Sequence, residues 1–147
     1  MRVTEIKNIK ISHECYNNPI YLSWLNVYGG REYWLFGKVQ DYGLNTSVNE
    51  TFEPIVQDNS IARGYSVESS RNANETITLY SNLDIEDVKG VKSILYSTNV
   101  EMLISESPLV WQNVRPQIGT FKTYSTNETK SKLSFTIELP RINIQGQ

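Results

Sequence analysis

The residues best able to do chemistry lie close together near the amino terminus, in the tetrapeptide SHEC. His13 is the only histidine and Cys15 the only cysteine of the 147-residue chain. On a strand, residues i and i+2 share a face, so the imidazole could activate the thiol as a nucleophile. A cysteine nucleophile also needs an orienting group and a positioned oxyanion site, and no motif supplies either. We therefore expect no catalytic residue, and a lone cysteine forms no internal disulfide.

Metal and cofactor motifs are equally sparse. Glu14 lies between His13 and Cys15, but a zinc site needs three or four well-spaced ligands and the chain has no other His or Cys. The carboxylate-rich calcium loop, the P-loop and the nucleophile elbow are all absent. The Gly29–Gly30 pair precedes an expected strand, whereas a dinucleotide loop follows one. The sequence thus predicts a non-enzymatic protein without metal, cofactor or small-molecule substrate.

The charge balance argues against two classes of partner. The chain has 14 basic and 16 acidic residues, a net charge of −2, and no run of Lys or Arg. Such a chain has no overall attraction to nucleic acid or to an anionic membrane surface. No stretch approaches the roughly 18 apolar residues of a membrane span. We expect neither sequence-specific binding of nucleic acid nor association with a membrane.

Aromatic residues are the feature that remains. The segment YLSWLNVYGGREYWLF (21–36) holds six of the chain's sixteen aromatic residues. Such rings could form a core, a protein interface, or a platform on which sugar rings stack. The spacing in 21–36 favours the core, with an interface next. The expected core or interface aromatics are Tyr21, Trp24, Tyr28, Tyr33, Trp34, Phe36 and Trp111.

The glycine pair divides this segment into two expected elements. Residues 18–28 are predicted to form a short helix, because Ile20, Trp24 and Tyr28 recur at i, i+4 and i+8. Asn18 would cap that helix and Gly29 would follow its last turn. The consecutive apolar residues 33–36 are predicted to form a central strand covered on both faces.

The rest of the chain reads mostly as strands. A second helix is expected over 84–97, capped by Asp84, and residues 71–74 read as a turn within a hairpin over 64–81. Further strands are expected at 3–11, 47–56, 64–69, 75–81, 99–105, 109–114, 118–125 and 132–139. The prediction is one mainly β domain over 1–139, an antiparallel β-sandwich or split barrel with two short helices, followed by an extended tail over 140–147.

The segment CYNNPIYLSWLNVYGGREYWLF (15–36) resembles a recurring pattern in virion proteins of phages that infect Bacteroidota. In that pattern a cysteine precedes a short helix bearing W-L-N, a G-G turn and an aromatic strand. The downstream order is also similar, through ETITLYSNLDIEDVKGVKSILYSTNVEMLI and WQNV to the final LSFTIELP, so the resemblance extends from Cys15 to Pro140. It implies a tail or neck component, such as a tail hub or connector ring protein of crAss-like phages.

The resulting expectation is a virion structural protein that forms a homo-oligomeric ring and is made in the bacterial host cytoplasm. Its partners would be copies of itself and neighbouring virion proteins. Rings arise when one edge of a subunit meets the opposite edge of the next. The alternative is a carbohydrate-binding β-sandwich module, which requires exposed, coplanar rings among Tyr21, Trp24, Tyr28, Trp34 and Trp111.

Overall fold

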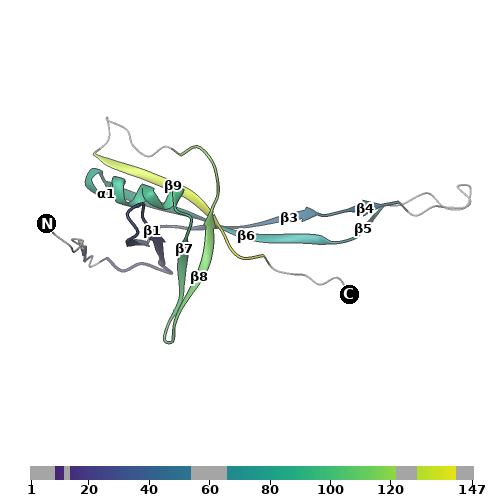
Figure 1. The fold of residues 1–147 in the computed structure, drawn as a ribbon, viewed down its shortest axis with the longest axis horizontal. Helices are drawn as coiled ribbons and strands as arrows, with labels where there is room; N and C mark the ends of the chain where they lie inside the picture. The colour runs from purple at the N-terminus through teal and green to yellow at the C-terminus, as the bar shows by residue number, and fades with distance from the viewer. Residues whose placement is uncertain (1–8, 12–13, 54–65, 122–128, 142–147) are drawn as a thin grey trace, which may run out of the picture.

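The fold consists of a compact body from which a long two-stranded arm projects (Figure 1). It comes from a computed structural model that describes residues 9–11, 14–53, 66–121 and 129–141. The elements are β1 (Ile20–Leu25), β2 (Arg31–Phe36), β3 (Asp41–Val48), β4 (Thr51–Phe52), β5 (Val67–Glu68), β6 (Arg71–Asp84), α1 (Ile85–Val91), the 3-10 helix η1 (Lys92–Tyr96), β7 (Val100–Glu106), β8 (Leu109–Pro116) and β9 (Lys130–Glu138). The chain is therefore mainly β, as its sequence predicts.

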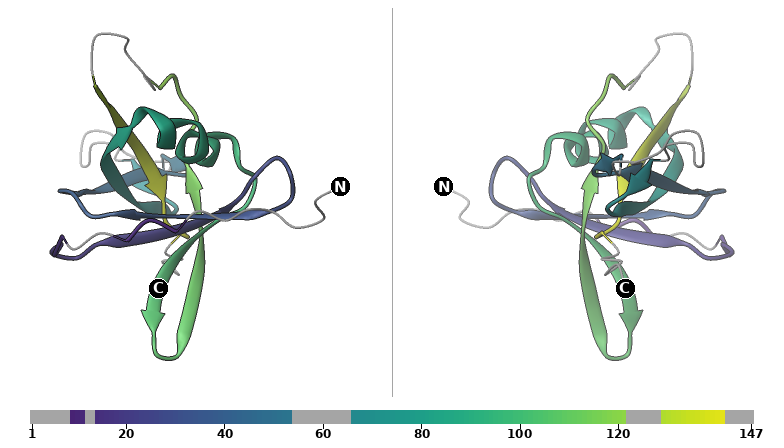
Figure 2. Two further views of the ribbon diagram at one scale, coloured as in Figure 1. Left: turned by 90° about the vertical axis from the view of Figure 1, so that its left-hand side faces the viewer. Right: turned by 90° about the vertical axis from the view of Figure 1, so that its right-hand side faces the viewer.

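Seven strands form one antiparallel sheet in the order β2-β1-β7-β8-β9-β6-β3. The sheet bends at β8, whose last two residues pair with β9 while the rest of the strand pairs with β7. The two halves thus face each other in a sandwich-like arrangement, and α1 contacts β2 on one side and β6 and β9 on the other (Figure 2). A bond from Trp34 Nε1 to Ser81 Oγ, 3.2 Å long, joins β2 directly to β6.

The core lies between the two halves and the helix. Its largest fully buried side chains are Trp24, Phe36, Leu22, Leu79, Leu83, Ile94, Leu133 and Ile137. Phe36 and Phe135 meet edge to face across it, with ring centroids 5.4 Å apart. Trp24 keeps its polar atom satisfied, because its Nε1 donates to Ser93 Oγ at 2.6 Å.

The expected helix over 84–97 is confirmed as α1 and η1. Val88 and Val91 are buried, whereas Ile85 is 48% exposed. Asp84 occupies the cap position, but its side chain bonds no helix N–H. Its carboxylate instead accepts from Lys10 Nζ at 3.0 Å, and Lys10 also donates to Asp87 at 2.8 Å.

The expected helix over 18–28 is wrong, since this segment is strand β1 and its turn. The pair Ile20 and Trp24 fits either a helix face or a strand face, and Leu22 decides the matter. With Leu22 at 0% exposure between two buried neighbours, the buried residues alternate with period two. Asn18 has φ 52°, in the left-handed region that asparagine tolerates, so it does not cap a helix. The part of the chain that the structure describes thus has one helical segment, α1 with η1, rather than the two expected.

The strand expected at 33–36 exists as β2, but it is not central. It lies at the edge of the sheet and pairs only with β1. Phe36 and the half-buried Trp34 face the core, while Tyr33 and Leu35 on the other face are 44% and 40% exposed. The run of apolar residues therefore contributes side chains to two surfaces, the core of the body and the outer face of the sheet.

The hairpin expected over 64–81 is replaced by a much longer one. β6 pairs along all of β3, from Asp41 opposite Thr78 to Val48 opposite Arg71. Residues 71–74, predicted as a turn, are thus part of β6. The strands expected at 47–56 and 64–69 reduce, among the described residues, to the end of β3 and the short pair β4 and β5.

The later strands agree better with expectation. The predictions at 75–81, 99–105, 109–114 and 132–139 are confirmed by β6, β7, β8 and β9. Residues 118–121 form no strand, and the remainder of the strand expected at 118–125 falls outside the described residues, as does most of that expected at 3–11. The division into a domain over 1–139 and a tail over 140–147 stays a prediction.

Candidate functional site: an aromatic face and a projecting arm

Three of the seven expected aromatics meet on the outer surface of the half-sheet β2-β1-β7-β8. Strand alternation puts Tyr21, Tyr33 and Trp111 on the face opposite the core, together with Leu35 and Leu103. These five residues are called the aromatic face. Tyr33 and Leu35 are exposed, and the other three are half-buried.

The rings of the aromatic face pack against one another. Tyr21 and Tyr33 are nearly parallel, with centroids 6.0 Å apart and planes 19° apart. Trp111 lies 6.0 Å from Tyr21, tilted by 41°, and 6.3 Å from Tyr33, tilted by 59°. Burial, followed by the neighbouring Tyr33, raises the pKa of the Tyr21 hydroxyl above its usual value. The cluster is therefore an uncharged surface from which water is partly excluded.

A polar network borders the rings at one end. Arg31 forms an ion pair with Glu101 and also donates to Asn99 Oδ1 at 3.0 Å and to Ser23 Oγ at 3.2 Å. Because the guanidinium is held by several acceptors, this charge is already neutralised and fixed in place. The aromatic face thus combines an apolar centre with a paired polar rim.

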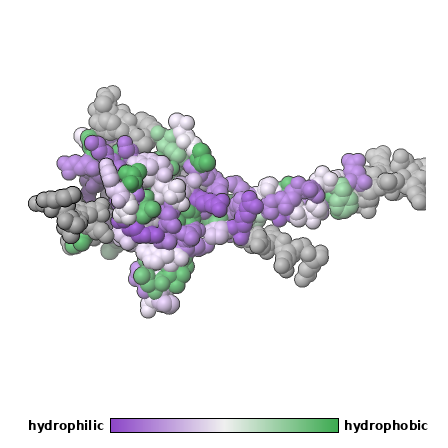
Figure 3. All heavy atoms as spheres, in the orientation of Figure 1, coloured by the Kyte–Doolittle hydropathy of each residue, from purple (hydrophilic) through white to green (hydrophobic). Residues whose placement is uncertain are grey.

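A groove of about 550 Å³ continues the aromatic face towards the β7–β8 hairpin. Its lining is Pro19, Tyr21, Leu35, Leu103, Ile104, Ser105 and Glu106. The hairpin projects beyond the body, and Figure 3 shows hydrophobic residues gathered at its end. Ile104 and Leu109, from this hairpin, are 51% and 66% exposed. Apolar surface thus continues from the sheet onto the hairpin.

The arm is the second unusual surface. All eight residues of β3 are exposed, and they alternate between two kinds of side chain. Tyr42, Leu44, Thr46 and Val48 lie on one side, where the three apolar or aromatic residues are 69%, 60% and 42% exposed, and Phe52 in β4 is 53% exposed. Residues Asp41, Gly43, Asn45 and Ser47 lie on the other side of the strand. The arm face is defined here as Tyr42, Leu44, Val48 and Phe52.

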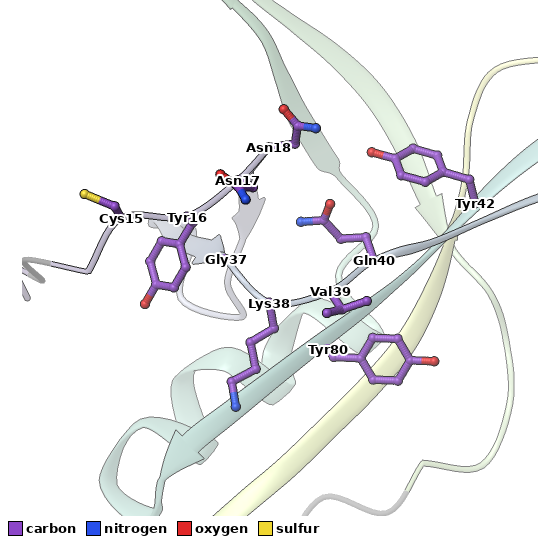
Figure 4. A pocket seen from close by; sticks show the side chains of 10 residues that line it. All are labelled: Cys15, Tyr16, Asn17, Asn18, Gly37, Lys38, Val39, Gln40, Tyr42 and Tyr80. Carbon is purple, nitrogen blue, oxygen red and sulfur yellow. The ribbon is translucent and has the colours of Figure 1, made fainter.

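A shallower groove of about 610 Å³ lies where the arm leaves the body (Figure 4). Tyr16 covers Gly37 so closely that a Cβ there would lie 2.4 Å from the ring. Gln40 Nε2 donates to the carbonyl of Phe36 at 3.1 Å, and the hydroxyl of Tyr80 donates to Asp41 at 2.7 Å. These contacts anchor the base of the arm.

Cys15, one half of the thiol–imidazole pair considered and rejected from the sequence, lies at this groove. Cys15 is exposed at its rim, and Figure 4 shows the sulfur pointing away from Gln40. His13 falls outside the described residues, so the expectation that His13 and Cys15 form no catalytic pair stays a prediction. Within those described, no group of three or more His, Cys, Asp or Glu could hold a metal ion.

The other expected aromatics separate into core and turn. Trp24 and Phe36 are core residues, and Trp34 packs against the core. Tyr28 is 90% exposed in the β1–β2 turn, where Asn26 Oδ1 accepts from the amides of Tyr28 and Gly30 at 3.0 and 2.9 Å. The arm face was missed by sequence reasoning, although the alternation of Tyr42, Leu44 and Val48 with polar neighbours is visible in the sequence.

Comparison with known proteins does not assign a family. A scan of the chain against protein-family models finds no match, and a search of curated proteins finds none either. Over the described ranges, no helix is long and apolar enough to cross a membrane.

Proposed function

We propose that this protein is a non-enzymatic structural subunit that assembles with copies of itself into a ring, in the tail or neck of a phage virion. The observation that carries the assembly is the arm, an exposed ribbon whose strand β3 holds Tyr42, Leu44 and Val48 in water on one side. An isolated two-stranded hairpin is marginally stable in water, and exposed apolar strands invite association. A neighbouring subunit would cover this ribbon and stabilise it.

The edge of the arm also supports association. Among the described residues, β3 ends the seven-stranded sheet and pairs on one side only, with β6. It contains no lysine or proline and no bulge, the usual features that block edge pairing. Its one charged side chain, Asp41, is already bonded to Tyr80. Such an edge suits a permanent contact with another protein.

The virion and its tail or neck enter the proposal through the resemblance over residues 15–140. The short helix which that resemblance implied is strand β1, so the assembly itself rests on the arm rather than on the resemblance. Neighbouring virion proteins are the further partners proposed.

Sedimentation velocity of the full chain over a range of concentrations tests the assembly. The chain has a mass of 16.9 kDa, and we expect a discrete larger species that dissociates on dilution. A mass of one chain at every concentration up to about 1 mM, the weak end of measurable affinities, would rule out self-assembly.

The aromatic face favours a second candidate, a carbohydrate-binding module. Tyr21 and Tyr33 lie nearly parallel on an open sheet surface, which suits stacking on a sugar ring. Trp111 is the only tryptophan of that face, because Trp24 and Trp34 belong to the core side. Titration with oligosaccharides should then change the tryptophan fluorescence of the wild type but not of Trp111→Phe. An unchanged spectrum with all glycans tested argues against this candidate.

A further inference from the structure

We infer that the arm face of one copy binds the aromatic face of the next copy, so that the two surfaces form a single repeated head-to-tail interface. This inference rests on the proposed self-assembly and identifies the surfaces responsible for it. The occupant of both surfaces is therefore a second copy of this chain.

The two surfaces match in apolar character. Weighted by their exposures, the four side chains of the arm face offer roughly 400 Å² of mostly apolar surface. The aromatic face together with Ile104 and Leu109 presents seven aromatic or apolar side chains, of which Tyr33, Leu35, Ile104 and Leu109 are 40–66% exposed. A stable interface buries about 800 Å² on each partner, a little over half of it apolar, which is about 450 Å². The arm face thus supplies close to the apolar area that one such interface requires, and the aromatic face supplies a surface of the same apolar character.

The two surfaces also match in reach. The eight residues of β3 extend about 26 Å at 3.3 Å per residue. The half-sheet β2-β1-β7-β8 has four strands, whose three spacings of 4.8 Å span about 14 Å. An arm laid across this half-sheet would therefore cover all four strands and still leave β4 beyond them.

Their charges permit close contact. Burial of an unpaired charge would oppose association, but Arg31 at the border of the aromatic face is paired with Glu101. On the arm, Arg71 is paired with Glu68, and Asp41 accepts from Tyr80. These charges have partners within their own copy, so the contact would not leave them uncompensated. Glu75, which lies opposite Leu44 on the same side of the arm, is exposed and has no ion pair among the described residues, so it would have to stay in water at the rim of the contact.

One copy cannot use both surfaces on itself, because the arm points away from the body (Figure 1). A symmetric contact between two arms would cover both arm faces but leave both aromatic faces in water. A head-to-tail contact covers the arm face of one copy and the aromatic face of the other. The two remaining faces stay free to bind further copies. Such heterologous contacts close into a ring or continue as a filament.

Complementary variants of the full chain test the inference. Leu44→Asp alters the arm face and Tyr33→Asp alters the aromatic face. Each variant alone lacks one half of every interface and should sediment as a monomer. Mixed in equal amounts, they retain one intact combination, the arm of Tyr33→Asp on the aromatic face of Leu44→Asp. The expected product is a 1:1 heterodimer that grows no further.

Matched controls separate charge from position. Asn45→Asp adds the same charge to the opposite side of β3, and Tyr28→Asp replaces an exposed tyrosine outside the aromatic face; both should assemble like the wild type. Far-ultraviolet circular dichroism checks that every variant is folded. If Asp at 33 prevents folding, Tyr33→Ser replaces it, with Tyr28→Ser as its control.

Three results would overturn the inference, and they differ from a failure of self-assembly. If Tyr33→Asp still assembles by itself, the aromatic face is not used and arm–arm contact is indicated. If the mixed variants stay monomeric while the wild type assembles, the two surfaces are not partners. If Leu44→Asp assembles like the wild type, the arm face is not used. A wild type that remains monomeric overturns the proposed function as well.

Discussion

The body and the arm are built from the same β-strands, yet they treat apolar side chains in opposite ways. In the body, Leu79 on β6 has 0% exposure and packs among β9, β1 and the helix. In the arm, Leu44 on the neighbouring strand is 60% exposed. β6 itself passes from one region to the other, so its inner half is stabilised by the core and its outer half by β3 alone.

The contrast separates the apolar side chains that stabilise the folded chain from those that remain exposed and can bind another molecule. Burial of apolar area stabilises the body, at about 25 cal/mol for each square ångström removed from water. The arm obtains little of this stabilisation within a single chain. Its apolar side chains therefore have a larger expected effect on association than on folding.

The largest difference is expected between two leucines. Leu79→Ala should lower the free energy of unfolding by about 2–5 kcal/mol, because it leaves a cavity in the core. Leu44→Ala should change it by no more than about 0.5 kcal/mol at concentrations where the protein is monomeric. Guanidinium unfolding curves of both variants measure this. Equal effects would mean that the arm is packed in the monomer.

A smaller loss is expected from the buried hydrogen bond between Trp24 and Ser93. Ser93→Ala leaves the indole N–H of a side chain with 1% exposure without its acceptor. An unsatisfied buried donor costs about 1–3 kcal/mol of stability. Ser47→Ala, in exposed β3, is the control and should be neutral in the same unfolding measurement. A neutral Ser93→Ala would contradict the described bond.

Disrupting the anchor at the base of the arm is expected to lower the free energy of unfolding by about 1–3 kcal/mol. Gly37→Ala forces Tyr16 off its position, because the new Cβ would lie 2.4 Å from the ring. In Tyr16→Ala the same glycine change should be nearly harmless, so a double-mutant cycle should show strong coupling. Additive losses would show that the ring does not cover the glycine.

The smallest effect concerns the exposed ion pairs at the start of α1. The hydrogen bond from Lys10 lowers the pKa of Asp84, so its contribution to stability is present above the ordinary carboxyl pKa of 3.8 and is lost as the pH falls. Lys10→Met should therefore raise the Asp84 pKa towards its usual value, as measured by NMR of the carboxyl carbon. Lys132→Met should leave the Asp84 pKa unchanged. An unmoved Asp84 pKa in Lys10→Met would disprove the contact.

Strands with strong alternation were predictable from the sequence. β9 shows it most clearly, with Leu133, Phe135 and Ile137 buried in turn. β1 was mistaken for a helix because Ile20 and Trp24 satisfy both periods, and only pairing with β2 and β7 resolves the ambiguity. Local patterns are overridden in such cases by contacts made across the sheet.

The candidate site was predictable only in part. Tyr21, Tyr33 and Trp111 could each be named as core or interface residues, but their meeting depends on strands β1, β2 and β8, which are far apart in the sequence. The arm was not predicted because residues 71–74, with two asparagines, have the composition of a turn. They are held in β6 by their pairing with β3 over its whole length.

Amide hydrogen exchange of β3, followed at low and high protein concentration, tests most directly whether the arm is covered by a second copy. At low concentration the amides of β3 that do not face β6 should exchange quickly, since among the described residues that side of the strand has no sheet partner. At high concentration their exchange should slow, while that of the core strand β9 stays unchanged. Equal exchange of β3 at both concentrations, in samples that sedimentation shows to be assembled, would contradict the role proposed for the arm.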